Sequence, residues 1–368
     1  MLYRFLFFNA IKGNKSLLQV DQWGRLHTVK ALFQVGAFRN FRYRSTVFSD
    51  TRIAERFEVL ETDALRRLNV KVARALLEAG LLKAVGVLDG PMLGHRHCCV
   101  FGLVTRWGDV MLLDVEPTDS SGDEFNGSDR VMKRGVKLGF AGLVDYCLFD
   151  ALYVNERVLG WHQKGWVKHL VIKYSPKDSE AKKRFRRMIT VFDEMVDVWQ
   201  IHPSGSKAVQ LQVQMGFQEV SGRDRARKQS YRIFYASSNR YDRRWAIARV
   251  EEWSADEQVN LFYVFTTDKA LPPESLWEMA HQRWCIENDG FKLLNAQVGS
   301  KKHRLSNLNV WLNWLLIQIL AVGLLMLFRR EYVYQWRRAY GGVKLTLGFV
   351  GKSLLEGNLY IEVHWLDS

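Results

Sequence analysis

The sequence predicts an α/β fold in which a mixed sheet is flanked by helices, and three observations support this prediction. Short apolar runs with the composition of strands begin with LKAVGVLDG, which ends at Gly90. Gly108-Asp109 lies between two further runs, HCCVFGLVTRW and VMLLDVE, and is a turn signal typical of a hairpin. Apolar side chains at helical spacing occur in residues 50–80 and again from Trp277 to Gln297.

The N-terminal segment, residues 1–80, is partly helical by this criterion. Asp50 or Thr51 is a suitable N-cap, and Gly80 is a suitable end, for a helical stretch over residues 50–80. Two interpretations of this stretch remain open: a small module that contacts DNA, or a helical layer packed on the sheet.

The elements that follow have the order of a known core. Three strands are followed by a helix near 128–138 and by a fourth strand at 143–149. Such an order opens an RNase H-like core, in which the first and fourth strands lie side by side. We assign residues 81–175 to the first part of this core, with WVKHLVIKYS as one more strand.

A β-rich insertion is predicted at residues 176–272, before the last catalytic helix. Its expected strands are KAVQLQVQMGF, SYRIFYASS, RWAIARVEEW and NLFYVFTTD. Pro272-Pro273 marks the return to the core, and residues 273–330 supply its closing helices. Residues 331–368 form a basic C-terminal tail.

The uncharged run from Val310 to Phe328 is close to the length of a membrane span. Asn313 and Gln318 lie within it, and the rest of the chain is soluble in character. We therefore expect a buried helix that closes the core, and no membrane partner. A membrane-anchored basic protein is the alternative.

Charge predicts the kind of partner. The 368 residues carry a formal net charge of +14, and the isoelectric point is about 9.6. A surplus of this size favours a polyanion: nucleic acid, here double-stranded DNA, is the first candidate and an anionic membrane surface is the second. The composition is that of a globular and not a disordered chain. The four cysteines have no framework spacing and there is no clear signal peptide, so we expect a cytoplasmic protein.

Three acidic residues are the candidate catalytic groups. Asp89 follows the first strand, Asp150 follows the fourth, and Glu287 lies on the helical stretch one turn after Arg283. Each has a structural alternative: Asp89 opens a turn, Asp150 caps a helix, and Glu287 pairs with Arg283. Their order favours convergence on two Mg²⁺ or Mn²⁺ ions, which take oxygen ligands and support phosphodiester displacement.

Other acidic and metal-binding side chains compete with these three. Asp145 is an odd number of residues from Asp150, so we expect it on the opposite face of its strand. Asp114 and Glu116 are expected to flank the site. His95, His97, Cys98 and Cys99 are zinc-capable, but adjacent cysteines rarely complete a tetrahedral site.

Four segments together resemble DDE transposases of insertion sequences. HQRWCIENDGFKLL is similar to the R-W-x-I-E-N-x-x-F signature of that family. VLDGPMLGHRHCC and CLFDALYVN resemble its two Asp segments, and LLDVEPTDSSGDEFNGSDRVMKR resembles its third-strand segment. The resemblance implies that Asp89, Asp150 and Glu287 are the catalytic metal ligands. It implies that Arg283 touches DNA phosphate or orients Glu287, that Trp284 supports the site, and that the chain acts as a homodimer on DNA.

The chain departs from the family pattern at three positions. Ala280 stands where the family often has Tyr, Leu294 where many members have Lys, and Pro91 where a small polar residue is expected. Lys292 lies off the helical face on which that Lys would stand. These departures concern phosphate contacts and not the acidic triad.

Basic side chains complete the predicted DNA contacts. Arg283 and Lys292 are expected beside the site, and a basic run is expected to bind phosphate from the insertion. That run comprises Lys182, Lys183, Arg184, Arg186 and Arg187.

The sequence thus predicts a nucleoid-associated transposase that cleaves DNA and joins its 3′-hydroxyl to a target. The alternative is a catalytically inactive or domesticated DNA-binding protein derived from a transposase.

Overall fold

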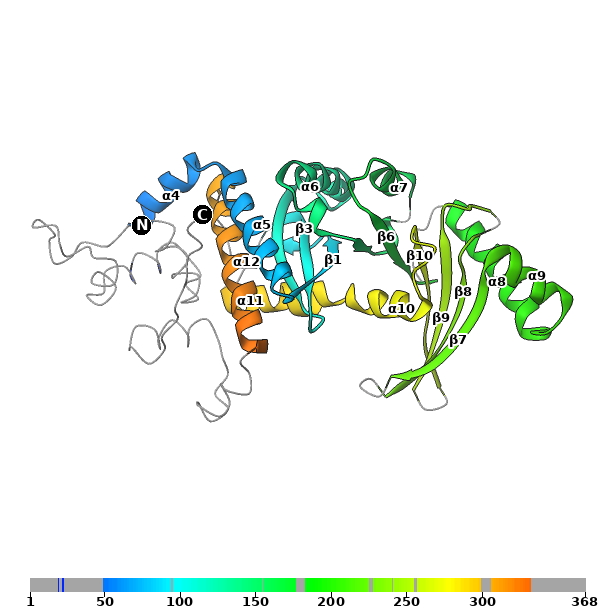
Figure 1. The fold of residues 1–368 in the computed structure, drawn as a ribbon. Coiled ribbons are helices and arrows are strands. Elements are labelled where there is room, and N and C mark those ends of the chain that lie inside the picture. Colours follow the sequence, from blue (N-terminus) through cyan, green and yellow to red (C-terminus); the bar gives the residue numbers. More distant parts are fainter. Residues whose placement is uncertain are drawn as a thin grey trace, which may run out of the picture. The chain divides into compact units, whose positions relative to one another are not determined.

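The computed structural model describes most of the chain between residues 49 and 331, and it has the mixed α/β architecture that the sequence predicted (Figure 1). The described ranges are 49–93, 95–153, 155–176, 183–224, 228–239, 241–254, 257–298 and 306–331, with the isolated positions 19 and 22. The chain divides into two compact units. The first comprises Met1–Lys83, Gly90–Val131 and Glu287–Ser368, and the second comprises Ala84–Asp89 and Met132–Ile286.

The first unit begins with two helices where the sequence predicted one stretch. These are α4 (Asp50–Val59) and α5 (Thr62–Glu78), separated at residues 60–61. The N-cap of α4 is Ser49, one residue before the predicted cap, and its side chain accepts a hydrogen bond from the Arg52 amide at 3.2 Å. Gly80 follows the C-terminus of α5 with a φ of +67°, a conformation that glycine adopts without strain.

An antiparallel hairpin forms the sheet of this unit. Strands β3 (Arg96–Thr105) and β4 (Val110–Thr118) pair along their length, and the short β2 (Met92–Leu93) pairs with β3. Gly108 has a φ of +93° in the connection, so the predicted hairpin turn is confirmed. Helix α5 packs on β4.

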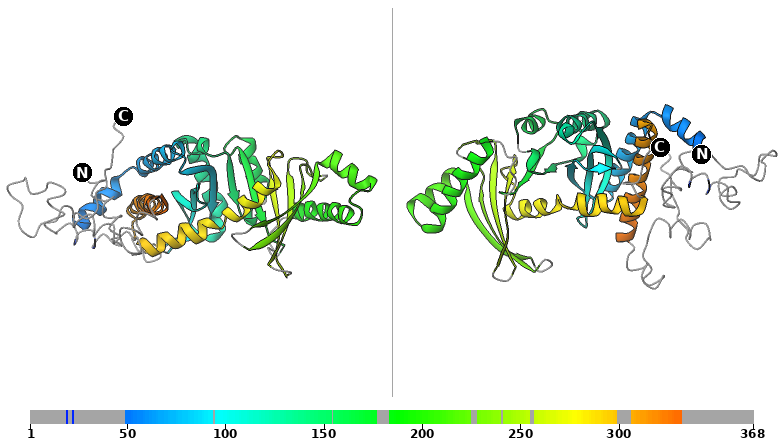
Figure 2. Two further views of the ribbon diagram at one scale, coloured as in Figure 1. Left: turned by 60° about the horizontal axis from the view of Figure 1, so that its bottom comes forward. Right: turned by 180° about the vertical axis from the view of Figure 1, so that it is seen from behind.

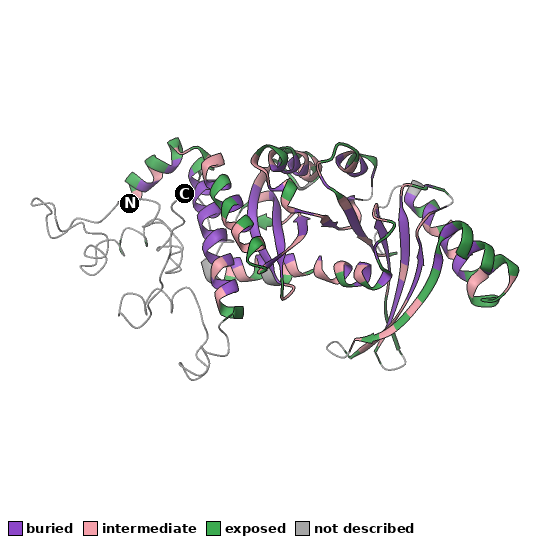
Figure 3. Cartoon of the chain, viewed as in Figure 1, coloured by how far each residue is buried: buried purple, intermediate pink, exposed green. Residues whose placement is uncertain are grey.

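Helix α12 (Leu308–Glu331) contains the uncharged run and is buried almost all round (Figure 3). It contacts α4, α5, α11 (Lys292–Val298) and β4. A Cβ at Gly323 would lie 2.7 Å from the Met111 side chain, so glycine allows α12 to approach β4 closely. Of the described helices, α12 alone is long and apolar enough to cross a membrane, but 94% of its most apolar window is buried inside the protein. This burial fits the predicted core helix.

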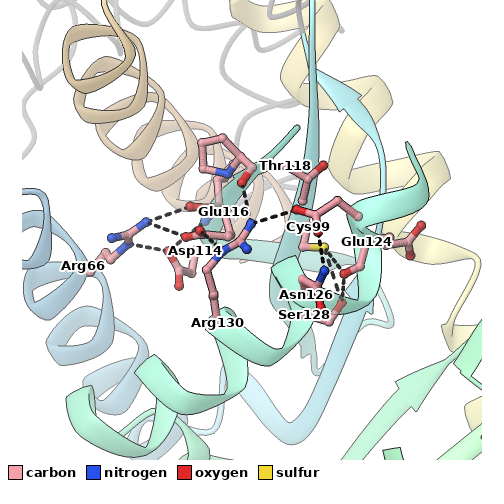
Figure 4. Close-up of polar contacts among 12 residues, drawn as sticks. Arg66, Cys99, Asp114, Glu116, Thr118, Glu124, Asn126, Ser128 and Arg130 are labelled. Atoms are coloured by element: carbon pink, nitrogen blue, oxygen red, sulfur yellow. Dashed lines mark hydrogen bonds and ion pairs between the residues drawn. The ribbon is translucent and has the colours of Figure 1, made fainter. Parts of the chain in front are cut away.

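An ion-pair network fastens α5 to the hairpin (Figure 4). Arg66 is buried and donates from Nε to Asp114 at 2.8 Å and from Nη2 to the Val115 carbonyl at 2.9 Å. Glu116 lies 3.6 Å from the same guanidinium and also accepts a hydrogen bond from Arg130. The Asp114 carboxylate therefore pairs with a buried cation, and this pair joins β4 to α5 in the first unit.

The second unit is built on a sheet whose strand order is β1-β5-β6-β10-β9-β8-β7. Strand β1 (Leu82–Asp89) runs parallel to β5 (Tyr146–Phe149), which runs parallel to β6 (His169–Tyr174). The predicted adjacency of the first and fourth strands is thus confirmed. The antiparallel remainder comprises β10 (Glu257–Thr266), β9 (Ala246–Ser254), β8 (Gln229–Ala236) and β7 (Phe217–Asp224).

Helices cover both faces of the antiparallel strands (Figure 2). Helices α8 (Lys183–Ile201) and α9 (Ser206–Met215) lie on one face, and α10 (Pro273–Gln282) contacts β8, β9 and β10 from the other. The unit also contains α7 (Glu156–Gln163), which packs on β6, and the C-terminal part of α6 (Glu124–Leu138).

The prediction of a strand at KAVQLQVQMGF was wrong, because most of this segment forms α9. Its alternating apolar residues fit a strand, but the buried set is Ala208, Leu211 and Met215, which has helical spacing. Val209 and Val213 are exposed. The helix ends at Gly216, whose φ of +58° forms a left-handed cap, and β7 begins only at Phe217.

The predicted continuous helix from Trp277 to Gln297 was also wrong. Helix α10 ends at Gln282, and a turn at residues 283–284 leads to a π-helix (η5, Ile286–Phe291) and then to α11. In a regular helix Met279, Ile286 and Leu293 would form one apolar stripe, but only Ile286 is buried, whereas Met279 and Leu293 are half-buried. The residues buried instead are Leu276, Trp277, Ala280 and Leu294.

Candidate active site

Asp89 is the last residue of β1 and Asp150 follows the last residue of the adjacent parallel strand β5, at the same level of the sheet in the second unit. The register pairs Val87 with Leu148, and two further residues along each strand lead to Asp89 and Asp150. Neighbouring strands lie about 5 Å apart. The two carboxylates therefore stand at one sheet edge, as the order of strands predicted.

Arg283 lies beside Asp89. Its Nη1 atom is 3.9 Å from Asp89 Oδ2, and the residue is only 8% exposed. Its guanidinium also lies 5.6 Å from the ring centre of Trp284, which is 48% exposed. Lys173 on β6 lies 5.5 Å from the same ring. An exposed aromatic side chain between two cations thus lies near the Asp89 carboxylate.

Asp150 also has a local structural role. Its Oδ1 accepts a hydrogen bond from the Leu152 amide at 2.9 Å, which starts the short 3₁₀ turn Ala151–Tyr153. The capping interpretation is therefore true of one carboxylate oxygen. Asp145, by contrast, precedes β5 at the other end of the strand and forms an ion pair with Lys168 at 2.8 Å. Its position excludes it from the edge where Asp150 lies.

Glu287 is a half-buried residue of the π-helix and belongs to the first unit, whereas Asp89 and Asp150 belong to the second. π-Helical turns are rare and often mark functional sites. Within the described ranges, no group of three or more His, Cys, Asp or Glu side chains is arranged to hold a metal ion. The convergence of all three acidic residues remains a prediction.

A further carboxylate, Glu124, lies against the residue that follows Asp89. A Cβ at Gly90 would be 2.2 to 2.6 Å from the three carboxyl atoms of Glu124, at the start of α6. Only glycine therefore fits at position 90 while Glu124 keeps this position. The sequence did not single out Glu124, which is one of several acidic residues in the polar segment PTDSSGDEFNGSD.

Two departures from the family pattern are core positions in this chain. Ala280 is 1% exposed and Leu294 is fully buried, where it lines a small apolar cavity with residues of α12 and β4. Both positions therefore lie in the interior and not at the surface. Lys292 is exposed and donates a hydrogen bond to Asn288.

The zinc alternative finds no support among the described side chains. Cys98 and Cys99 are buried in β3, and burial raises the pKa of each thiol to about 12. His95, in contrast, is exposed.

The basic run is only partly described. Lys182 lies outside the described residues, and so do the side chains of Lys183 and Arg184. Arg186 and Arg187 are exposed on α8, and the Arg187 guanidinium lies 5.1 Å from the ring centre of Tyr241. A phosphate-binding role for this run remains a prediction.

The sequence reasoning missed a buried carboxylate that holds α10. Glu252 on β9 is fully buried and accepts hydrogen bonds from Trp277 at 2.6 Å, His281 at 2.6 Å and Asn260 at 2.8 Å. Burial favours a raised pKa for Glu252, but the hydrogen bond and charge of His281 and the other two donors outweigh it. The pKa is lowered to about 2. The signal that could have identified Glu252 is the pair of acidic residues inside an apolar strand, in the segment RVEEW.

This shift predicts an acid-sensitive contribution to folding. The pKa of Glu252 falls from 4.5 to about 2 on folding, so its stabilisation is complete above pH 4.5 and is lost as the pH falls toward 2. Between pH 4.5 and about 2, the unfolding free energy of the unaltered protein should fall by about 3 kcal/mol more than that of Glu252→Gln. Urea unfolding at neutral pH and at steps down to about pH 2 measures it. If the unfolding free energies of the unaltered protein and of Glu252→Gln fall equally with pH, the lowered pKa of Glu252 would be contradicted.

Comparison with known proteins assigns no family to the chain. No family model matches it, and no curated protein is significantly similar to it.

Proposed function

We propose that this protein is a DNA transposase of the DDE type, with an RNase H-like core, that cleaves DNA strands and joins the 3′-hydroxyl to a target. One observation carries the proposal. Asp89 and Asp150 end adjacent parallel strands at one level of the sheet, and Arg283 of the R-W-x-I-E-N segment lies 3.9 Å from Asp89. Residues from three segments that resemble one family thus lie close together in the second unit, and this supports the proposal.

The side chains at this edge suit the chemistry. Carboxylate oxygens are the ligands that Mg²⁺ and Mn²⁺ prefer, so Asp89 and Asp150 are suited to hold such ions, with Glu287 as the third ligand. Two bound ions activate the attacking oxygen and stabilise the leaving oxygen of a phosphodiester. Arg283 contributes positive charge beside the Asp89 carboxylate and beside the DNA phosphate.

Charge supports a DNA substrate. The formal net charge of +14 favours a polyanion, and exposed Arg186, Arg187 and Lys292 supply cations at the surface. We further propose a cytoplasmic, nucleoid-associated protein that acts as a homodimer on two element ends.

A direct assay uses a plasmid that carries this coding sequence with its flanking DNA. The purified full chain should nick or cut that plasmid with Mg²⁺ or Mn²⁺, and it should not do so with EDTA. Cleavage that persists with EDTA would overturn the metal-dependent mechanism.

The second candidate is a DNA-binding protein without catalysis, derived from a transposase. The burial of Ala280 and Leu294, where phosphate-contacting Tyr and Lys are expected, favours it. Binding of the flanking DNA without cleavage, together with no saturable Mn²⁺ binding, would support this candidate over the enzyme.

A further inference from the structure

Helix α10 is attached to the sheet of the second unit through the buried Glu252 carboxylate. Trp277 and His281 are one turn apart on α10, and both donate to Oε1 of Glu252 at 2.6 Å. Asn260 on β10 donates to the other oxygen, Oε2, at 2.8 Å. Because Glu252 is ionised, the Nε2 atom of His281 must be the donor. One carboxylate oxygen of Glu252 thus accepts hydrogen bonds from α10 and the other accepts one from β10.

Aromatic side chains from the flanking strands close this contact. Tyr231 on β8, which pairs with Glu252 across the sheet, stacks on Trp277 with ring centres 4.4 Å apart. Phe262 on β10 meets His281 edge-on at 5.9 Å. Three strands therefore hold the same face of α10, and the charges lie in an apolar surrounding where they interact strongly.

The attachment lies immediately before the proposed site. His281 precedes Arg283 by two residues, and the Arg283 amide still bonds to the Met279 carbonyl of the last turn of α10. Arg283 in turn faces Asp89 at 3.9 Å. A shift or rotation of α10 on the sheet would therefore move the guanidinium away from the carboxylate.

We infer that Glu252, with His281 and Trp277, is a positioning device that fixes Arg283 against Asp89. This inference rests on the proposed function. Glu252 acts through α10 and touches neither DNA nor metal in this role.

The same sheet supplies a matched control on its opposite face. Alternate residues of a strand point to opposite faces, so Arg249 and Tyr263 face α8, whereas Glu252 and Phe262 face α10. Asp193 on α8 accepts hydrogen bonds from Tyr263 at 2.8 and 2.9 Å and from Arg249 at 3.3 Å. It is a half-buried carboxylate held by an aromatic donor and a cation, but it is not attached to α10.

The experiment compares Glu252→Gln with Asp193→Asn in the full chain. Three quantities are measured: the strand-cleavage rate at saturating DNA, the DNA affinity, and the urea midpoint. We expect Glu252→Gln to slow cleavage about 10- to 100-fold with DNA affinity nearly unchanged, because a small misplacement affects reaction geometry more than binding. Asp193→Asn should lower the urea midpoint and leave the cleavage rate unchanged.

A conservative change at His281 separates positioning from folding. The amide of His281→Gln still donates to Glu252, so this variant should retain more activity than Glu252→Gln, and it replaces Glu252→Gln as the test if that protein does not fold. The double variant should be no slower than Glu252→Gln alone, because both residues act through one contact.

The outcomes distinguish the two proposals. An active unaltered protein with fully active Glu252→Gln and His281→Gln variants would overturn the positioning role and leave the proposed function standing. Equal losses of cleavage rate in Glu252→Gln and Asp193→Asn would show that Glu252 stabilises the fold and does not position Arg283. No cleavage by the unaltered protein would overturn the proposed function and the positioning role with it.

Discussion

Asparagine in place of Asp89 or Asp150 is expected to lower the rate of DNA cleavage by at least about 10³-fold. Each substitution removes one charged oxygen donor from the edge of the sheet, and metal assistance to phosphodiester displacement supplies several kcal/mol of transition-state stabilisation. The measurement is single-turnover cleavage of the flanking-DNA plasmid in Mg²⁺ and in Mn²⁺. Saturable Mn²⁺ binding should disappear in Asp89→Asn.

Asp145→Asn is the matched control for this prediction. Asp145 comes from the same strand region as Asp150, but it precedes β5 and is paired with Lys168 at the surface. Its substitution should leave cleavage unchanged. Full activity of Asp89→Asn or Asp150→Asn would remove that residue from the active site.

Glu287→Gln extends the test to the third acidic residue. Glu287 belongs to a π-helix in the first unit, and its approach to the other two carboxylates is a prediction from sequence order alone. A loss of activity equal to that of Asp89→Asn would support convergence. Unchanged activity would restrict the site to the two aspartates of the second unit.

The strands of the site were predictable because they are short, apolar and bounded by clear turns. The run that ends at Asp89 is buried on both faces, and so is the run that ends at Phe149, one residue before Asp150. Strands of this kind appear as continuous apolar runs in a parallel arrangement. The hairpin turn at Gly108 was equally direct, because a positive φ there needs glycine.

What apolar periodicity did not reveal is which polar side chains lie on a buried face. In α5, Leu68 falls at helical spacing with other apolar residues, yet it is 40% exposed and the buried face contains Arg66 and Asn69. The partners of these side chains lie on β4, more than 40 residues away in the chain, and apolar periodicity does not reveal such pairs. Glu252 escaped notice because its hydrogen-bond donors, on β10 and α10, are polar residues that apolar periodicity does not connect to β9.

Periodicity also misassigned two helical segments. Alternating Val and Leu in α9 imitates a strand, and only the buried set shows the helical face. In the stretch from Trp277 to Gln297, the turn and the π-helix shift every later residue relative to a regular helix. The expected one-turn relation between Arg283 and Glu287 therefore does not follow from their spacing, although the segment itself was located correctly.

Loss of Arg66 should destabilise the first unit by about 3–5 kcal/mol, the range for breaking a buried ion pair by removing one partner. In Arg66→Met the Asp114 carboxylate, which is 2% exposed, loses its cation in the interior. The free energy of unfolding in urea measures the effect. Glu61→Gln is the control, because the exposed Glu61–Arg67 pair should contribute at most about 1 kcal/mol.

A double substitution decides whether the uncompensated charge causes the loss. Arg66→Met combined with Asp114→Leu removes both charges and should recover part of the stability, since apolar pairs often replace buried ion pairs at little cost. If the double variant is less stable than Arg66→Met alone, then packing and the hydrogen bond from Arg66 to the Val115 carbonyl, and not the unpaired carboxylate, dominate the effect. In either case DNA cleavage by the folded fraction should persist, because this network joins α5 to β4 and contains none of Asp89, Asp150 and Glu287.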